Sequence, residues 1–205
     1  MEAAGTREVS AGRDSELKMA PAITTDRLLL RGWRLEDRAP FAAMNTDPRV
    51  MEFYRQKLSR EESDAYVDRI EAHFEHEGFG LFAAELRDTG EFIGYVGLAV
   101  PRFEAPFTPC VEIGWRLAAE YWGRGFATEG ARAALVWGFE SLGLPEIVAY
   151  AVPANVRSIR VMQKIGMKRD EAGDFDYPNL PPGHPLRRHV LYRAARPDFS
   201  AENSG

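Results

Sequence analysis

The sequence predicts a single-domain α+β fold, and three observations lead to this prediction. The chain has 205 residues, of which 45% are hydrophobic, so it can build one core of ordinary size. Residues 79–87 and 91–100 have the pattern of two strands, and Asp88-Thr89-Gly90 between them is a hairpin signal. After residue 110, strand patterns alternate with helix patterns. We therefore expect an antiparallel meander followed by the order β-α-β-α-β-β.

One strand and two helices are expected before this hairpin. Residues 27–34, with three consecutive leucines, indicate the strand. Asp37 marks the start of the first helix, and Pro40 is tolerated in its first turn. Ser59-Arg60-Glu61-Glu62 is a capping box, from which the second helix should run to about residue 76.

The rest of the chain continues with strands and helices. Strands are expected at residues 110–117, 146–152, 167–170 and 187–194, and helices at residues 127–142 and 155–165. In the first of these helices, Ala131, Ala134, Leu135 and Gly138 form a small apolar face that can pack closely against a sheet. Gly166 is expected to stop the second helix.

Composition defines the domain and excludes several classes of protein. Residues 1–20 and 200–205 are polar and without periodicity, so we expect mobile ends around a folded domain at residues 21–199. No apolar run approaches the roughly 20 residues of a membrane helix, and the opening residues lack the apolar segment of a secretory signal. We therefore expect a cytoplasmic protein that does not enter a membrane.

Charge and cysteine content narrow the function further. There are 26 basic and 31 acidic residues, and this net charge of -5 argues against a nucleic-acid-binding surface. Cys110 is the only cysteine, so no intrachain disulfide can form. We expect Cys110 to be a small buried side chain rather than a nucleophile.

A turn containing two glycines, Gly123-Arg124-Gly125-Phe126-Ala127, falls between a predicted strand and a predicted helix. Small residues there let the backbone approach a ligand and leave the first N–H groups of the helix free for an anion. Arg124 adds a charged donor, so the turn suits a pyrophosphate. Taken alone, such glycines are more often ordinary turn residues, and neither a Walker loop nor a dinucleotide fingerprint fits the sequence.

Five segments lie in a characteristic order along the chain: residues 25–31 (TDRLLLR), 111–115 (VEIGW), 121–129 (YWGRGFATE), 155–158 (NVRS) and 164–167 (KIGM). In this order they resemble the GCN5-related N-acetyltransferases of the RimJ/RimL-like branch. The turn is similar to motif A of that family, R/Q-x-x-G-x-G/A, with Trp122 where the general motif has Arg or Gln.

The resemblance implies a mixed, mostly antiparallel sheet with helices on both faces, splayed at its middle beside the strand at residues 110–117. Acetyl-coenzyme A is the implied cosubstrate, with its pantetheine arm bonded to backbone in the gap, and no metal is expected. The residues that the resemblance implies for cofactor binding are Arg116, Leu117, Trp122, Gly123, Arg124, Gly125, Phe126, Ala127, Thr128, Asn155 and Ser158.

Asn155 and Ser158 have two interpretations that can coexist. Asn155 precedes a predicted helix and is a good N-cap, and Ser158 then lies in the first turn. In similar acetyltransferases the Asn binds the pantetheine arm and the Ser hydroxyl lies near the thioester sulfur. Because the leaving thiolate has a thiol-like pKa of about 8.5, a hydroxyl donor stabilises it and can pass on a proton.

Glu112 is the candidate for removing the proton from the acceptor amine. An alkylammonium group has a pKa of about 10.4, so it is almost fully protonated at pH 7 and needs a base. Glu112 would act directly or through water, and Glu85 on the preceding hairpin is the second candidate. The alternative for Glu112 is a solvated carboxylate on the outer face of the sheet.

Three weaker features also have ordinary alternatives. His73 and His76 share a helix face, but solvated histidines are favoured over a metal site. Residues 177–189, which contain His184, form a Pro-rich connection that either shapes an acceptor pocket or is simply a surface loop. Tyr66, Trp33 and other aromatic residues near the first helices either line that pocket or belong to the core.

The expected function is transfer of an acetyl group from acetyl-coenzyme A to a primary amine, by direct attack and without a covalent enzyme intermediate. The acceptor is either a protein N-terminus or a small-molecule amine, and the sequence does not choose between them. The alternatives are a non-catalytic protein that binds or senses coenzyme A, and a purely structural domain. Analogy with the family suggests a homodimer.

Overall fold

The computed structural model describes residues 21–196 of the chain. The ends predicted to be mobile, residues 1–20 and 200–205, lie outside the described residues. The strands and α-helices are β1 (Ile23–Thr24), β2 (Leu28–Arg31), α1 (Arg38–Thr46), α2 (Arg60–Glu77), β3 (Leu81–Leu86), β4 (Phe92–Ala99), β5 (Glu112–Leu117), α3 (Phe126–Glu140), β6 (Glu146–Ala151), α4 (Val156–Lys164), β7 (Lys168–Asp176) and β8 (Arg188–Ala195).

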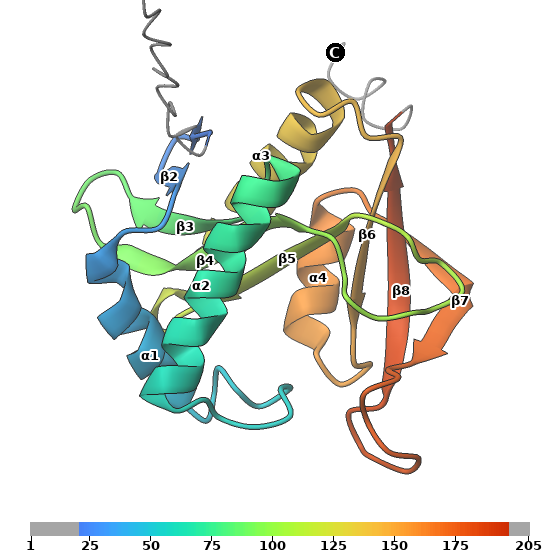
Figure 1. The fold of residues 1–205 in the computed structure, drawn as a ribbon. Helices are drawn as coiled ribbons and strands as arrows, with labels where there is room; N and C mark the ends of the chain where they lie inside the picture. The colour runs from blue at the N-terminus through green and yellow to red at the C-terminus, as the bar shows by residue number, and fades with distance from the viewer. Residues whose placement is uncertain (1–20, 197–205) are drawn as a thin grey trace, which may run out of the picture.

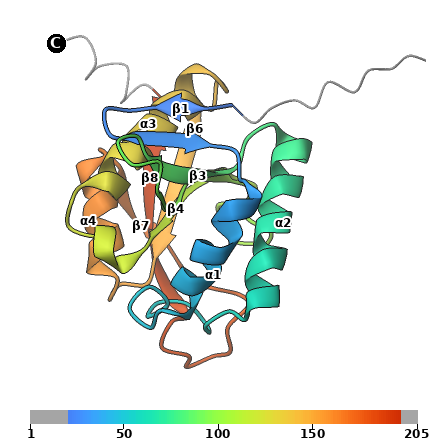
Figure 2. The ribbon, with the colours of Figure 1, turned by 90° about the vertical axis from the view of Figure 1, so that its left-hand side faces the viewer.

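The eight strands form one sheet in the order β1-β2-β3-β4-β5-β6-β8-β7. Every neighbouring pair is antiparallel except β5 and β6, which are parallel. Helices α1 and α2 cover one face of the sheet and α3 and α4 cover the other (Figure 2). The predicted α+β class, the meander and the following β-α-β-α-β-β order are therefore confirmed.

The sheet opens between β5 and β6. β5 pairs with β4 along its whole length, but its register with β6 consists of Glu112 opposite Val148. Next to this pair, the Val148 N–H donates to the Val111 carbonyl oxygen at 2.9 Å. Beyond it the two strands diverge, and α4 lies beside the opening (Figure 1). The predicted splay at the middle of the sheet is thus confirmed.

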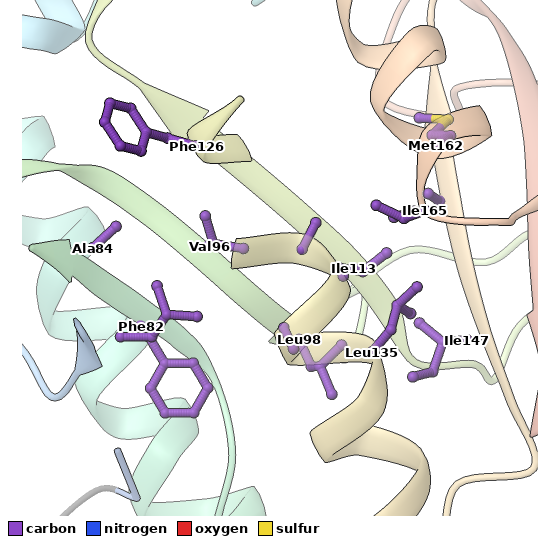
Figure 3. Close-up of a cluster of buried hydrophobic side chains, with 14 of the residues drawn as sticks. Phe82, Ala84, Val96, Leu98, Ile113, Phe126, Leu135, Ile147, Met162 and Ile165 are labelled. Atoms are coloured by element: carbon purple, nitrogen blue, oxygen red, sulfur yellow. The ribbon is translucent and has the colours of Figure 1, made fainter. Parts of the chain in front are cut away.

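Helix α3 packs closely against the sheet because its inner face is made of small residues. Ala131, Ala134 and Leu135 are fully buried, and Leu135 lies among the side chains of Leu98 and Ile147 (Figure 3). A Cβ atom on Gly138 would meet Ile147 Cδ1 at 2.8 Å and Leu98 Cδ1 at 2.9 Å. A larger residue at this position would require the buried side chains of Ile147 and Leu98 to shift.

Helix α2 begins and ends at local signals. The Ser59 side chain accepts a hydrogen bond from the Glu62 N–H, and the Glu62 carboxylate accepts one from the Ser59 N–H, so the predicted capping box is formed. Gly78, with φ of 78°, ends the helix in the left-handed conformation. The helix between these ends carries Tyr66, whose ring packs against those of Phe41 and Tyr95.

Strand β7 is longer than the predicted segment at residues 167–170. It continues to Asp176 through a register shift between Asp170 and Phe175. Within the shift, Asp170 accepts from the Gly173 N–H at 3.0 Å and Asp174 accepts from the Leu191 N–H at 3.2 Å. The acidic side chains replace part of the backbone ladder, so this half of the strand has no alternating apolar pattern.

No helix among residues 21–196 is long and apolar enough to cross a membrane.

Candidate active site

Two neighbouring cavities lie along β5. The first, of about 330 Å³, extends from the end of β5 to the start of α3 and along one side of α4. The second, of about 520 Å³, extends from the middle of β5 to the end of β6 and the connection between β7 and β8. The residues that line both cavities are Phe53, Tyr54, Trp115, Arg116, Asn155 and Ser158. The cavities therefore meet where the sheet opens.

The start of α3 forms one end of the first cavity. Gly125 is the N-cap of α3 with φ of 86°, Gly123 has φ of 74°, and no side chain caps the helix. The N–H groups of residues 126–128 thus have no partner within the helix, and these residues line the cavity. Free N–H groups at the positive end of a helix dipole form an anion-binding site.

A carboxylate holds this turn against the N-terminal strands. Glu129 accepts hydrogen bonds from Thr25 Oγ1 at 2.6 Å, from the Arg27 N–H at 2.9 Å and from Arg27 Nε at 2.7 Å. Arg27 Nη1 also donates to the Arg124 carbonyl oxygen at 3.0 Å. Burial opposes ionisation of Glu129, but the hydrogen bonds from Thr25 and Arg27 hold its pKa below the ordinary value. Two sequence segments that are far apart in the chain therefore support each other.

Trp122 and Arg124 differ in how they contribute to the turn. The Trp122 indole N–H donates to the Leu117 carbonyl oxygen at 2.8 Å, so the residue that departs from the general motif ties the turn to the end of β5. The Arg124 guanidinium lies over the Phe126 ring at 5.0 Å, and Arg124 is not among the described residues that line the cavities. A direct phosphate contact from the Arg124 side chain stays a prediction.

Asn155 caps α4 as predicted. Its side-chain oxygen accepts from the Ser158 N–H at 3.2 Å, which places Ser158 at the third helical position. Because the cap uses the backbone of Ser158, the Ser158 hydroxyl is not required for it. Both residues line both cavities, so capping leaves them available at the junction.

Glu112 lines the second cavity and not the first. It is half-buried, and burial raises its pKa from 4.5 to about 8. Side chains alternate along a strand, so Glu112, Gly114 and Arg116 share one face of β5. Glu112 thus lines a cavity and does not stand on an open outer face of the sheet.

Glu85, the second candidate for proton removal, lies elsewhere. It is buried, and Glu85 Oε2 accepts from Arg31 Nε at 2.7 Å and from Arg34 Nη1 at 3.0 Å. It does not line either of the cavities among the described residues. Glu85 therefore neutralises two arginines near the start of α1 and does not face the junction.

The histidines of α2 show no shared site. The His76 ring lies 2.9 Å from the Glu77 carboxylate, while the His73 ring packs edge-on against Phe79 at 5.5 Å. Within residues 21–196, no group of three or more His, Cys, Asp or Glu side chains is arranged to hold a metal ion.

Cys110 is half-buried, and burial raises the pKa of its thiol to about 11. A thiol with so high a pKa is a poor nucleophile at neutral pH, in agreement with the expected unreactive side chain.

The connection between β7 and β8 shapes the second cavity. It contributes Tyr177, Asn179, Leu180 and Leu186 to the lining, and a role of this cavity in binding the acceptor stays a prediction. His184 instead accepts a hydrogen bond from the Leu186 N–H at 3.1 Å within the connection. Tyr66 lines the same cavity. Trp33 packs with Tyr66 against the apolar cluster around Phe41 but does not line the cavity.

Sequence reasoning missed the segment between α1 and α2 and the side chain of Arg116. From this segment, Phe53 and Tyr54 line both cavities. The segment has no periodic pattern that would have marked it. Arg116 could have been found, because Glu112 and Arg116 are charged residues four positions apart on one predicted strand and must share a face.

The fold and the site together define an acetyltransferase. A family model for the acetyltransferase (GNAT) domain matches residues 27–168, and the chain belongs to this family. It is an acetyl-coenzyme A-dependent acetyltransferase.

The chain is similar to individual proteins over most of its length. The protein YkkB of Bacillus subtilis (strain 168) is 35% identical over 146 residues, which are 71% of this chain and 84% of YkkB. The FsC-acetyl coenzyme A-N(2)-transacetylase of Aspergillus fumigatus is 32% identical over 174 residues, which are 82% of this chain and 73% of that enzyme. The crystal structure of a GNAT-family acetyltransferase from Bacillus anthracis, 26% identical, superposes with a TM-score of 0.72 over 86% of this chain and 99% of that one.

Proposed function

We propose that the enzyme transfers the acetyl group of acetyl-coenzyme A to a primary amine at the junction of the two cavities. The observation that supports this most directly is that Ser158 lines both cavities, of which one contains the turn at the start of α3 and the other contains Glu112. One cavity then holds the cosubstrate and the other holds the acceptor.

The first cavity suits coenzyme A. The free N–H groups at the start of α3 would bind the pyrophosphate, with Gly123 and Gly125 allowing its close approach. Past Glu112, the edge of β5 that faces β6 has no strand partner, so backbone groups on this edge would bind the amide groups of pantetheine near Arg116 and Leu117. The Leu117 carbonyl oxygen already accepts from the Trp122 indole N–H, and the Arg116 carbonyl oxygen is turned toward Gly94 of β4. Asn155 would bind the same arm near the thioester.

The chemistry follows from the groups at the junction. The amine nitrogen attacks the carbonyl carbon of the thioester, a C–N bond forms and the C–S bond breaks. Glu112 takes the proton that the amine loses, since its raised pKa brings it closer to the pKa of an amine. The Ser158 hydroxyl donates a hydrogen bond to the departing thiolate. The proton taken by Glu112 returns to the sulfur through water, so coenzyme A leaves as the free thiol and both side chains end as they began.

The motif order supports placing the chain in the RimJ/RimL-like branch, and the name of the Aspergillus relative supports a nitrogen acceptor. A homodimer and a cytoplasmic location stay predictions.

Measuring release of coenzyme A with a panel of primary amines and peptide N-termini, followed by mass spectrometry of the products, tests the proposal. Acetylated amines are the expected products. Tight binding of acetyl-coenzyme A without transfer to any amine would instead indicate a sensor of coenzyme A.

A further inference from the structure

Arg116 is a buried cation without an acidic partner. Arg116 is 6% exposed, and within residues 21–196 no carboxylate forms an ion pair with its guanidinium group. Its Nη1 donates to Asn45 Oδ1 at 2.6 Å, and its Nε is buried with no hydrogen-bond partner. The guanidinium instead lies over the Tyr54 ring at 3.8 Å, with the rings of Tyr66 and Tyr95 at 5.5 Å.

Arg31 provides the comparison within the same molecule. It is also 6% exposed, but it is paired with Asp37 at 2.7 Å and with Glu85 at 2.7 Å. A buried charge is costly unless it is paired, and aromatic faces compensate only part of that cost. Arg116 lines both cavities, so a bound ligand can reach it. An anionic group on that ligand would supply the partner that Arg31 finds within the protein.

The acceptor side of the junction is lined by cations. A third cavity of about 200 Å³ shares Tyr66, Glu112, Tyr150 and Tyr177 with the second. The arginines that line these two cavities are Arg55, Arg69, Arg102 and Arg116, and Glu112 is the one carboxylate among their described lining residues. This excess of positive charge contrasts with the net charge of -5 of the whole chain. The site therefore disfavours a polycationic acceptor.

The spacing along β5 suits an acceptor with two functional groups. Glu112 and Arg116 are four residues apart on one strand face, which separates their Cα atoms by about 13 Å. Gly114 lies between them and has no side chain to fill the space. An extended small molecule lying over Gly114 can bring an amine toward Glu112 and an anion toward Arg116.

We propose that the acceptor is a small-molecule amine that also carries an anionic group, a carboxylate in the simplest case, and that Arg116 binds this group. The inference rests on the proposed function, because it names the class of amine that the junction accepts. A guanidinium binds carboxylates and phosphates with the same paired N–H donors, so either anion fits the chemistry.

Matched amines test the inference. Release of coenzyme A is measured with 5-aminopentanoate, with pentylamine, with O-phosphoethanolamine and with spermidine, for the wild type and for Arg116→Met. Arg60→Met is the control, because Arg60 is an exposed residue paired with Asp64 on α2. We expect 5-aminopentanoate or O-phosphoethanolamine to have a kcat/KM about 10 to 100 times that of pentylamine, the range for a charged hydrogen bond. The amine with the higher kcat/KM shows whether Arg116 binds a carboxylate or a phosphate.

The variants then separate anion recognition from a structural role. Arg116→Met keeps the apolar stem among the tyrosines, and we expect it to lose the preference for anionic amines, while Arg60→Met keeps it. Arg116→Lys should restore part of the preference, since the charge returns without the paired donors. Equal kcat/KM for pentylamine and the anionic amines, or an unchanged preference in folded Arg116→Met, would overturn the inference and leave the proposed function intact.

A binding measurement covers the case in which Arg116 variants do not fold or no probe is acetylated. Calorimetry on the wild-type complex with coenzyme A is expected to detect 5-aminopentanoate or O-phosphoethanolamine and not pentylamine or spermidine. If neither anionic amine binds, or if spermidine binds more tightly than both, the inference is wrong. Failure of the proposed function gives a different result, namely no transfer to any amine despite binding of acetyl-coenzyme A.

Discussion

Replacing Glu112 with Gln keeps the shape of the side chain and removes the group that we propose takes the amine proton. The pKa of Glu112 is about 8, and that of an ordinary alkylammonium group is about 10.4. The wild type depends on the ionised fraction of Glu112, and the variant depends on the fraction of acceptor that is free amine. Below pH 8 both fractions increase about tenfold per pH unit. The deficit of the variant is therefore constant in that range, and we expect it to be about 100-fold to 1000-fold, as is usual for loss of a general base.

Above pH 8 the two quantities no longer change together. The carboxylate is fully ionised, whereas free amine continues to accumulate up to its own pKa. The deficit of Glu112→Gln should then shrink about tenfold per pH unit, or about 100-fold between pH 8 and pH 10. The measurement is kcat/KM for the amine from pH 6 to pH 10, with Glu140→Gln, an exposed carboxylate of α3, as the control.

A deficit that stays constant from pH 6 to pH 10 would refute this reasoning. Glu112 would then position the acceptor, and the proton would pass to water, because Glu85 is occupied by Arg31 and Arg34.

The same substitution has an expected effect on stability. Burial raises the pKa of Glu112 from 4.5 to about 8, so the folded protein holds this proton more tightly than the unfolded chain does. The wild type therefore loses stability as the pH rises from 4.5 to 8, and Gln at this position avoids the loss. We expect the free energy of unfolding of Glu112→Gln, relative to wild type, to increase by roughly 2–4 kcal/mol between pH 5 and pH 9 in urea titrations. No change in this difference would mean that the carboxyl group is solvated in solution.

Other substitutions test the cofactor side. Gly125→Ala should lower acetyl-coenzyme A affinity at least about tenfold by calorimetry, because Ala is strained at a φ of 86° and its Cβ adds bulk at the turn. The control is Gly143→Ala, which has a similar φ of 68° and no atom within 4 Å of the added Cβ, and it should leave the affinity unchanged. Ser158→Ala should reduce kcat about 10-fold to 100-fold with little change in cosubstrate affinity, and equal losses in both would count against its role as a donor. Glu129→Gln should weaken cosubstrate binding more than Arg124→Ala does, since Glu129 holds the turn through several hydrogen bonds, and the opposite order would show that Arg124 contacts the phosphates.

The helices and most strands were predictable because their signals are local. The capping box at Ser59 and the small inner face of α3 depend on residues within a few positions of one another, and both formed as expected. The second half of β7 was not predictable. Its pairing depends on Asp170 and Asp174 binding backbone groups across a register shift, which no periodicity reveals.

The candidate site was predictable in part for the same reason. Motif segments identified the turn at Gly125 and the cap at Asn155, whose geometry is set locally. The roles of Glu85 and Arg116 depend on side chains that are distant in the sequence and close in the fold. These are two arginines for Glu85 and three tyrosines for Arg116. Tertiary neighbours decide whether a charged strand residue stabilises the fold or serves a ligand.

The opening between β5 and β6 divides the sheet into two mechanical units, five strands on one side and three on the other. In the sheet itself, the backbone at Glu112 and Val148 is the hinge that joins them. A molecule bound in the opening contacts both units at once and restrains their motion relative to each other. The enzyme should therefore be stiffest when loaded, and its resistance to unfolding should rise with the concentration of coenzyme A.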